Sequence, residues 1–544
     1  MFNLPFQHPV SPETAYSKPV AYFSMEFALD QALKIYSGGL GYLAGSHMRS
    51  AFQLRQNLVG IGVLWKYGYY DQERNEDNTM RATFREKIYH FLEDTGIRFQ
   101  IPLLGREVWV HAYYLAPGVF GTAPMFFLTT DTEGNDYAGR SVSYHLYDAD
   151  PTVKAAQCTL LGAGGGRLLE ALGWEPEVYH LNEAHALPLA FFLYDKTRNA
   201  GKLREKLVFT THTPEEAGNE KHNIFFLKNI GFFGRVPLEE VRKITGINDD
   251  IFNHTLGALR LSRKANAVSA LHGEVARRMW GGYPSICEII SITNAQNKLY
   301  WVDRELEASR EKGDGGEVAA RKRELKKKLF SVVADQTGRL FSPDVLTIVW
   351  ARRFAAYKRA DLLLGDTERF KRLMGNTDRP VQIIWAGKPY PKDEGAIRIF
   401  NHLQHLSYLY PGVAVLTGYE LGLSKLLKDG ADVWLNTPIV GREASGTSGM
   451  TAAMNAAINC STNDGWMPEF ARPGENSFIL PTITDGNQDE QDRNNLFQLL
   501  ESEVVPLYYD SKEKWQQIML TGMNEVAPAF DSDRMARQYY EKLY

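Results

Sequence analysis

Short runs of β-branched and apolar residues recur along this chain, and each is followed by a loop and a stretch with helical spacing. The clearest runs are Val178–His180, Leu207–Thr211, Ile289–Thr293, Leu346–Trp350, Gln382–Ala386 and Val433–Leu435. Continuous apolar strands that alternate with helices are typical of parallel sheets covered by helices on both faces. The chain is therefore predicted to be an α/β protein. Ligands bind at the carboxyl ends of such strands, so residues directly after each run are the first candidates for a site.

The chain has 544 residues, more than one hydrophobic core usually supports, which predicts at least two domains. Residues 303–328 are rich in Glu, Lys and Arg and are interrupted by glycines. A polyanion-binding patch is one interpretation. A solvated helix and linker is favoured because the acidic and basic residues are interleaved, and this places a domain boundary near residue 325. Residues 531–544 are predicted to form a helix capped by Asp531 or Ser532.

Charge and cysteine content exclude several classes of protein. The net charge of -4 argues against nucleic acid or an anionic membrane as the main partner. The three cysteines are far apart and form no CxxC pair, so neither a disulfide framework nor a metal site is expected. No basic region followed by an apolar stretch opens the sequence, and no apolar run is long enough to span a membrane. A cytoplasmic protein is expected.

A basic segment, Arg352-Arg353-Phe354-Ala355-Ala356-Tyr357-Lys358-Arg359, follows the predicted strand Leu346–Trp350 directly. A guanidinium such as Arg353 can form a two-pronged hydrogen bond to phosphate, and Lys358 can add a point charge. The alternative is a basic surface helix. The position at a strand end favours phosphate binding.

Two further segments have the composition of ligand-binding turns. Ser37-Gly38-Gly39-Leu40-Gly41 precedes a helical pattern, so its backbone can approach a ligand and its helix start favours an anion. The segment 442–450, Arg-Glu-Ala-Ser-Gly-Thr-Ser-Gly-Met, leads from the strand Val433–Leu435 into a helix that begins with small polar residues. Its amides suit a phosphate or sugar hydroxyls, and Glu443 can accept hydrogen bonds from a sugar. An ordinary turn and an ordinary capped helix start are the alternatives.

Three histidines lie at or just beyond predicted strand ends: His180, His185 and His212. An isolated histidine is more often structural than catalytic. The place of His212 in Thr210-Thr211-His212-Thr213-Pro214 makes it the candidate for a catalytic role.

Together these segments resemble the α-glucan phosphorylase family, in particular its shorter bacterial branch. The resemblance runs from Tyr22-Phe23-Ser24-Met25-Glu26-Phe27 to Asp464-Gly465-Trp466. Between them it includes Gly38–Gly41, His180-Leu181-Asn182-Glu183, Thr210–Pro214, Leu271-His272-Gly273-Glu274-Val275, Arg353 with Lys358, and Glu443–Met450. Several of these strings are unusual and stand in the family's order, which makes the set a specific signal.

The resemblance implies the GT-B fold, two Rossmann-like domains that face a deep cleft. The expected domains are residues 1–325, residues 326–520, and a C-terminal helix at 521–544 that packs back on the first domain. It also implies phosphorolysis of α-1,4-linked glucan to glucose 1-phosphate with retention, with pyridoxal phosphate as the cofactor. Partners would then be glucan or maltodextrin and a phosphate-bearing donor, in a chain that can form a homo-oligomer.

The resemblance also implies functional roles for individual residues. The candidate catalytic residues are Arg353, Lys358, Glu443 and His212. The candidate cofactor- or phosphate-binding residues are Gly38, Gly39, Gly41, Arg352, Ser445, Gly446, Thr447 and Thr451. The candidate substrate-binding residues are Asn294, Ala444 and Tyr419.

The sequence departs from the family pattern at three places. The family's cofactor lysine follows the methionine of the 443–450 motif, but Thr451 stands here, and a threonine has no amine for a Schiff base. Asn219 replaces a family histidine, with His222 nearby as a possible substitute. Asn294 continues as Ala295-Gln296-Asn297, where relatives carry a glycine and a histidine. Any bound pyridoxal phosphate is therefore predicted to be noncovalent, and altered chemistry is expected.

Three hypotheses follow from these residues. The first is a glucan phosphorylase or a close variant. The second is a retaining transferase that uses a nucleotide sugar, whose diphosphate would occupy the same cationic site. The third is a glucan-binding protein that has kept the fold and lost turnover. The retained cations count against the third, because buried unpaired cations are costly without a role.

Overall fold

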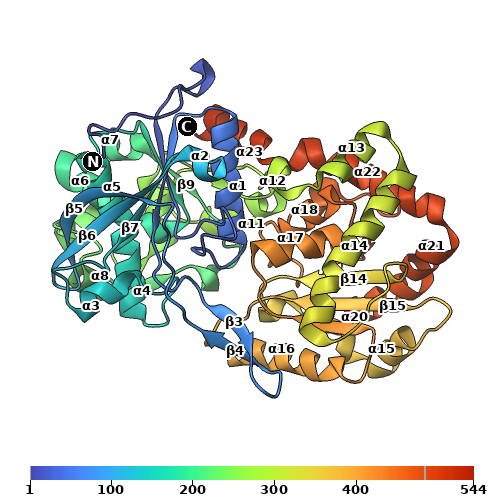
Figure 1. Cartoon of the computed structure of the whole chain (residues 1–544). Helices are drawn as coiled ribbons and strands as arrows, with labels where there is room; N and C mark the ends of the chain where they lie inside the picture. Colours follow the sequence, from blue (N-terminus) through green and yellow to red (C-terminus); the bar gives the residue numbers. More distant parts are fainter. Residues whose placement is uncertain (1, 483–485) are drawn as a thin grey trace. The chain divides into compact units, whose positions relative to one another are not determined.

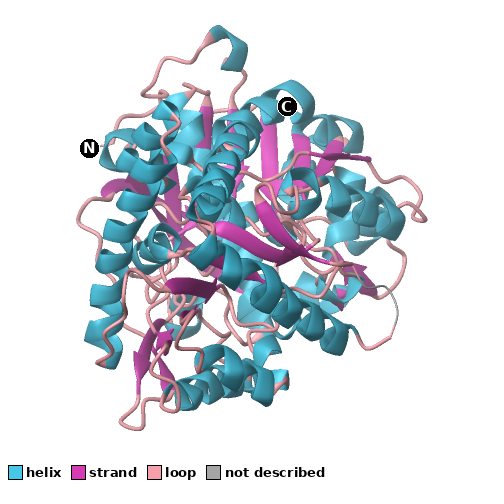
Figure 2. Cartoon of the chain, turned by 90° about the vertical axis from the view of Figure 1, so that its right-hand side faces the viewer, coloured by secondary structure: helices cyan, strands magenta, loops and turns pink. Residues whose placement is uncertain are grey.

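The computed structural model describes residues 2–482 and 486–544 and contains two compact units. The first unit comprises residues 1–70, 84–294 and 532–544, and the second comprises residues 71–83 and 295–531. Residue 325, near which the sequence predicts a boundary, lies inside helix α14 (Gly315–Thr337). Figure 1 labels the elements along the chain, and Figure 2 distinguishes helices from strands.

A nine-stranded sheet forms the centre of the first unit, in the order β13-β12-β9-β8-β1-β2-β7-β6-β5. Neighbours are parallel from β13 to β7, and β6 runs antiparallel to both β7 and β5. The strands are β1 (Val20–Phe23), β2 (Leu58–Val63), β5 (Glu93–Leu103), β6 (Arg106–Leu115), β7 (Met125–Thr129), β8 (Val178–Asn182), β9 (Leu207–Thr210), β12 (Lys264–Ala267) and β13 (Glu288–Ser291).

The main helices of this unit alternate with the strands. They are α1 (Gly39–Gln53), α4 (Pro151–Thr159), α5 (Gly165–Ala171), α6 (Pro188–Thr197), α7 (Ala200–Lys206), α8 (Ile224–Ile230), α9 (Leu238–Thr245), α10 (His254–Leu261), α11 (Ala270–Trp280) and α23 (Ser532–Gln538). In the predicted C-terminal helical region, residues up to Phe530 belong to α22 (Lys512–Phe530), and α23 begins at Ser532. Helix α23 lies beside α1, and Ser532 Oγ is 2.6 Å from Ser50 Oγ (Figure 1).

A six-stranded parallel sheet forms the centre of the second unit, in the order β16-β15-β14-β17-β18-β19. Its strands are β14 (Leu346–Ala351), β15 (Val381–Ala386), β16 (Val413–Leu416), β17 (Val433–Asn436), β18 (Ile458–Thr462) and β19 (Ser477–Leu480). Its main helices are α13 (Arg304–Lys312), α14, α15 (Thr367–Met374), α16 (Glu394–Ser407), α17 (Leu421–Gly430), α18 (Ser448–Met454), α20 (Gln488–Leu499) and α22 (Lys512–Phe530).

A two-stranded hairpin from early in the chain belongs to this second unit. It consists of β3 (Asp71–Arg74) and β4 (Met80–Thr83). The backbone N–H of Met80 donates to Asn401 Oδ1 of α16 at 2.9 Å, and Gln72 Nε2 donates to the carbonyl of Gly387 at 2.9 Å. The blue hairpin is visible beside α16 in Figure 1. Nothing in the local sequence predicts this placement.

All six strands predicted from apolar runs are present, within one or two residues of their predicted ends. Their residues pack against helices, as continuous apolar strands require. Val349 of β14 and Trp434 of β17 are fully buried in one cluster with Leu329 of α14 and Leu427 of α17. Burying each such side chain contributes about 1.5–3 kcal/mol to folding. The fold is thus a mixed α/β architecture with parallel sheets, as predicted.

The charged segment 303–328 forms two helices, α13 and α14. Gly313, with φ of +71°, ends α13, and Asp314 caps α14 by accepting from the N–H of Glu317. The interleaved charges pair locally, as in Arg310 with Glu307 and Lys312 with Glu317. The two helices and their local charge pairs agree with the helical interpretation, but the segment is not a solvated linker, because Lys322 and Lys326 of α14 are buried and Lys326 pairs with Asp432. None of the helices in the described ranges has the length and apolar character required to cross a membrane.

The strand order of each sheet contains one reversal point. In the second unit the chain passes through β14, β15 and β16 to one edge, and then through β17, β18 and β19 to the other. In the first unit the same reversal lies between β1 and β8. Ligands of open α/β sheets bind beside the strand ends at such reversal points. A ligand site is therefore expected among the residues that follow β14 and β17 in the second unit. In the first unit, it is expected among the residues that follow β1 and β8.

Candidate active site

The predicted phosphate-binding cations of the second unit meet Glu443 at the β14–β17 reversal point. Lys358 Nζ donates to Glu443 Oε2 at 2.7 Å, and Arg352 Nη1 approaches the same oxygen at 3.4 Å. The side chains of Arg352, Lys358 and Glu443 are only 6%, 11% and 12% exposed. The structure therefore brings three of the predicted residues together as a largely buried ion cluster.

The local chain path explains how Lys358 reaches Glu443. After β14 the chain forms a short 3₁₀ turn, Ala356–Lys358, and then Arg359, whose φ of +50° is unusual for a side-chain-bearing residue. Arg359 Nε donates to the carbonyl of Thr437 at 2.8 Å, and its Nη2 donates to Asp492 Oδ2 at 2.6 Å. The first bond fastens the segment after β14 to the loop after β17, and the second fastens it to α20. Arg359 belongs to the basic segment 352–359, but nothing in the sequence indicates this positioning role.

Asp464 shapes the loop that carries Glu443. Its Oδ2 accepts from the backbone N–H groups of Gly441, Arg442 and Glu443 at 2.9, 3.2 and 2.9 Å. Its Oδ1 accepts from the N–H of Gly465 at 2.8 Å. Burial raises the pKa of Asp464 to about 6, although these hydrogen bonds act in the opposite direction. Asp464 belongs to the motif Asp464-Gly465-Trp466, which resembles the family pattern, but nothing in the sequence indicates its role in shaping this loop.

Glycines allow the loop to turn tightly beside Glu443. Gly446 has φ of +83°, and Gly465 has φ of +63°. A Cβ at Gly465 would lie 2.3 Å from the carbonyl oxygen of Ser445, so no side chain fits there. This close approach explains why the loop needs glycine at that point.

The electrostatics of the cluster favour an additional anion. Burial would raise the pKa of Glu443, but Lys358, Arg352 and Arg353 together hold it below its ordinary value, so Glu443 is ionised. Arg353 is exposed, unlike Arg352, yet lies close enough to contribute to this effect. Among the described residues, the buried Arg352 Nε and Ser445 Oγ have no hydrogen-bond partner. Three cations against one carboxylate leave capacity for a phosphate.

Further residues of this unit predicted to form the site are Tyr419, Ala444, Gly446 and Thr447. Tyr419 lies behind β14, where its hydroxyl donates to the carbonyl of Ala351 at 3.2 Å. Ala444 and Gly446 are partly buried in the loop, and Thr447 precedes the first residue of α18. Ser448, which was not predicted, accepts from Arg352 Nη2 at 3.3 Å and so contacts the cluster directly.

Thr451, at the position of the family's cofactor lysine, is fully buried. Its Oγ1 donates to the carbonyl of Ser448 at 3.0 Å, inside α18. Of the two lysines on the neighbouring α17, Lys425 Nζ donates to the carbonyl of Trp301 at 2.8 Å, and Lys428 Nζ lies 3.7 Å from the Trp301 ring centroid. The residues near Thr451 thus do not fit a Schiff base at this position, whereas the cations fit a phosphate.

In the first unit, the predicted glycine turn holds a carboxylate of the protein itself. Glu26, which follows β1, accepts from the N–H groups of Ser37 and Gly38 at 2.6 and 3.0 Å and from Tyr147 Oη at 2.9 Å. Gly41 is needed because a Cβ there would lie 2.8 Å from Glu26 Oε2. Gly38 and Gly39 have open space where a side chain would project. The N–H groups of Ser37 and Gly38 thus hold a carboxylate of the protein, whereas the sequence predicted a bound ligand, and Glu26 was not predicted as their partner.

His212 lies at the end of β9, beside the last residue of β8. Its Nε2 is 2.7 Å from Asn182 Oδ1, and Asn182 Nδ2 donates to Ser24 Oγ at 3.1 Å. Glu183, with φ of +68°, accepts from the N–H of His212 and from Thr213 Oγ1. Burial lowers the pKa of His212 to about 3 and raises that of Glu183. His212 is therefore a neutral, tightly held side chain.

The other candidate residues of this unit differ in their surroundings. Asn294 is buried, and within the described ranges its Oδ1 accepts no hydrogen bond from the protein. His180 is instead fully enclosed, with Nε2 2.6 Å from Thr210 Oγ1 and Nδ1 2.7 Å from Tyr544 Oη. Asn294 retains the capacity to bind a ligand, and His180 is a structural residue.

Comparisons with known proteins give relatives over nearly the whole chain. Residues 304–495 match the family model described as carbohydrate phosphorylase. An uncharacterised protein from Methanocaldococcus jannaschii is 47% identical over 97% of this chain and 100% of its own length. The maltodextrin phosphorylase of Thermococcus litoralis is 32% identical, over 99% of this chain and 73% of its own length. The glycogen phosphorylase of Aquifex aeolicus is 30% identical, over 98% of this chain and 87% of its own length. The resemblance read from the sequence is confirmed, and the chain belongs to the carbohydrate phosphorylase family.

Proposed function

We propose that this chain is a retaining glycosyltransferase of the phosphorylase type, acting on α-1,4-glucan with a phosphate group as the second reactant. Relatives named maltodextrin phosphorylase and glycogen phosphorylase support the substrate class. The observation that carries the proposal is the buried cluster of Arg352 and Lys358 with Glu443 beside the β14–β17 reversal point. The GT-B arrangement of two Rossmann-like domains around a cleft is part of the same proposal.

The cations are assigned to the phosphate. Arg352 and Arg353 would hold its oxygens, and Lys358 would neutralise a further charge. Their charges are fixed before the substrate arrives, which is how a site stabilises a transition state with several phosphate charges near a developing positive sugar carbon. In the forward reaction a phosphate oxygen bonds to the anomeric carbon, the glycosidic C–O bond breaks, and a proton from the phosphate passes to the departing sugar oxygen.

Glu443 and the loop around it are assigned to the glucose unit. Its carboxylate would accept hydrogen bonds from sugar hydroxyls, and the amides near Ser445 and Gly446 would donate to them. Asn294 and Ala444 would contact the same sugar, and Tyr419 would support the pocket from behind β14. Because His212 Nε2 faces the Asn182 amide oxygen, its neutral imidazole would offer Nδ1 as a hydrogen-bond acceptor.

The family's cofactor is pyridoxal phosphate, which supplies a phosphate group next to the reacting phosphate. We propose that this chain binds it noncovalently if it binds it, since Thr451 provides no amine. Gly38, Gly39 and Thr447 are the remaining candidates for contact with its phosphate. Glu26 already occupies the N–H of Gly38, so any such contact would use other groups of this turn.

The test is turnover by the purified full-length chain, with and without pyridoxal phosphate. Release of glucose 1-phosphate from maltodextrin and orthophosphate supports the proposal, and Lys358→Met should abolish it while Arg398→Ala, on the exposed face of α16, should not. Release of a nucleoside diphosphate from a nucleotide sugar would instead identify the second hypothesis. Maltodextrin binding without turnover under any of these conditions would contradict an enzymatic role and indicate a glucan-binding protein.

A further inference from the structure

A small antiparallel ribbon in the first unit places three metal-ligating side chains on one face. The ribbon consists of β10 (Lys221–Asn223) and β11 (Ile251–Asn253), with His222 opposite Phe252. Glu220 and His222 are two residues apart, so their side chains leave the same face of the strand. The N–H of His254 donates to the carbonyl of Glu220 at 3.0 Å, which continues the ladder and places His254 opposite Glu220.

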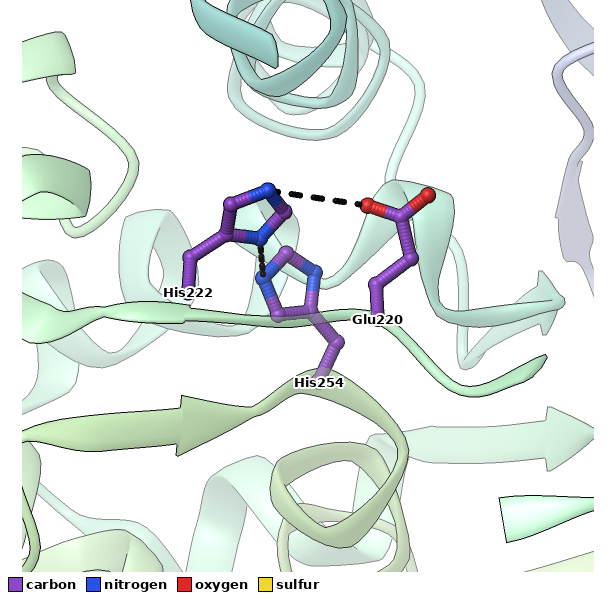
Figure 3. Close-up of side chains that lie close together, drawn as sticks. All are labelled: Glu220, His222 and His254. Atoms are coloured by element: carbon purple, nitrogen blue, oxygen red, sulfur yellow. Dashed lines mark hydrogen bonds and ion pairs between the residues drawn. The ribbon is translucent and has the colours of Figure 1, made fainter. Parts of the chain in front are cut away.

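The donor atoms of these three residues converge. One ligand atom from each of Glu220, His222 and His254 lies within 4.8 Å of the others, and no other group of three His, Cys, Asp or Glu in the described residues meets this condition. His222 Nδ1 lies 3.1 Å from His254 Nε2, and His222 Nε2 lies 3.9 Å from Glu220 Oε2 (Figure 3). Two nitrogens on a tetrahedral zinc ion, each about 2.0–2.1 Å from it, are about 3.3 Å apart. The imidazole pair is already near that separation through His222 Nδ1, which is then the His222 ligand atom; the 3.9 Å approach of Glu220 is to the other ring nitrogen, Nε2.

The surroundings hold the two imidazoles rigid and neutral. Phe226 stacks on His222 with ring centroids 5.7 Å apart, and Phe232 lies against His254 at 4.8 Å. Burial lowers the pKa of His254 to about 3 and also lowers the pKa of His222, although Glu220 opposes the effect on both.

Glu220 is ionised and has one oxygen directed at the histidines. Its pKa is held below the ordinary value because the opposing effect of burial is outweighed by Lys154 of α4 and the nearby histidines. Lys154 pairs with Oε1, whereas Oε2 is the oxygen that approaches His222. His185 also lies near enough to influence Glu220, and within the described part of the chain its buried Nδ1 has no hydrogen-bond partner.

We propose that Glu220, His222 and His254 bind one divalent transition-metal ion of the class that prefers imidazole and carboxylate ligands, such as Zn²⁺ or Co²⁺. The ion cross-links β10 to the start of α10. It thereby fixes the far end of the loop that begins at His212. This site was not expected from the sequence, which pointed to no metal, and it does not depend on the proposed function.

The experiment uses the tag-free full chain after treatment with a chelator and its removal. Co²⁺ is titrated while the visible absorption of the metal is recorded, and Zn²⁺ binding is measured by calorimetry. We expect one equivalent of each metal to bind, with the intense absorption of a four-coordinate Co²⁺ site. Glu220→Gln and His222→Asn should each raise the Kd for the metal by more than about tenfold. Replacing a residue that only hydrogen-bonds to a metal ligand already weakens metal binding by about tenfold or more.

The matched control is His111→Asn. His111 Nε2 lies 2.7 Å from Asp94 Oδ1, but among the described residues no third metal-ligating side chain joins this pair. This variant should bind the metal as the parent chain does. The alternative is a hydrogen-bonded histidine pair beside a Lys154–Glu220 ion pair, with no metal. Absence of one-equivalent binding by the parent chain would establish that alternative and overturn the proposal. Equal binding by folded Glu220→Gln and His222→Asn proteins, verified by circular dichroism, would overturn it as well.

Discussion

Lys358 Nζ lies 2.7 Å from Glu443 Oε2, so two residues assigned to different reactants neutralise each other directly. Glu443 is also the only carboxylate among the described residues that forms an ion pair with Arg352. An incoming phosphate would share Arg352 and Lys358 with Glu443, so the charge of this carboxylate is expected to weaken anion binding.

Replacing the carboxylate should strengthen anion binding. In Glu443→Gln the competing charge is absent, and we expect orthophosphate to bind about tenfold more tightly, since a charge-assisted hydrogen bond contributes about 1.5–3 kcal/mol. Turnover should be lost because the sugar loses its acceptor. Calorimetric titration with orthophosphate measures the first effect, and unchanged or weaker binding would show that Glu443 does not compete for the site.

Arg353 is exposed but contributes to the positive potential at Glu443. Arg353→Ala is expected to weaken binding of any phosphate-bearing ligand by more than about 1.5 kcal/mol, the lower end of the range for charged hydrogen bonds. Arg398→Ala is the control, because Arg398 is 74% exposed and pairs only loosely with Glu394. Equal affinities for the two variants would mean that Arg353 is a surface charge.

Covalent attachment of pyridoxal phosphate should depend on position 451. The parent chain is expected to give no borohydride-reducible adduct on any lysine, and Thr451→Lys is expected to give one. The longer side chain must enter a fully buried position, at a cost of about 1–3 kcal/mol in stability. Mass spectrometry of reduced peptides decides the point. A lysine adduct in the parent chain would contradict the noncovalent model, and a folded Thr451→Lys without an adduct would implicate Asn219 and Asn297 as further obstacles.

Asp464 should make stability depend on pH in a defined direction. Its folded-state pKa of about 6 is above the ordinary value of 3.8, so the folded chain takes up a proton between these two pH values before the unfolded chain does. The resulting stabilisation is complete below pH 4 and is lost as the pH rises through 6.

The comparison is with Asp464→Asn, which cannot titrate. Between pH 7 and pH 5 the parent chain should gain about 1–2 kcal/mol relative to this variant, since one unit of pKa corresponds to about 1.4 kcal/mol. Urea denaturation at the two pH values measures the difference. The same dependence in both proteins would assign the effect to another group.

The strands and the family could be read from the sequence because both depend on local patterns. An apolar run such as Leu346–Trp350 is buried on both faces wherever a parallel sheet forms around it. The cations after β14 were found for the same reason, since a strand end is recognisable from the residues that precede it. Residues whose roles depend on distant partners were not found. Asp464 acts by accepting from the N–H groups of residues 441–443, and Glu26 by accepting from Ser37 and Gly38.

The sequence by itself determined the alternation of strands and helices, the family, and the loss of an amine at Thr451, because each follows from residue identity and order along the chain. Tertiary structure alone decided that the early hairpin β3–β4 joins the second unit, that Glu443 pairs with Lys358, and that Glu220, His222 and His254 share one face. The physical reason is distance along the chain. Local spacing fixes which face of a strand a side chain leaves, whereas the partner it meets there is set by the packing of segments far apart in sequence.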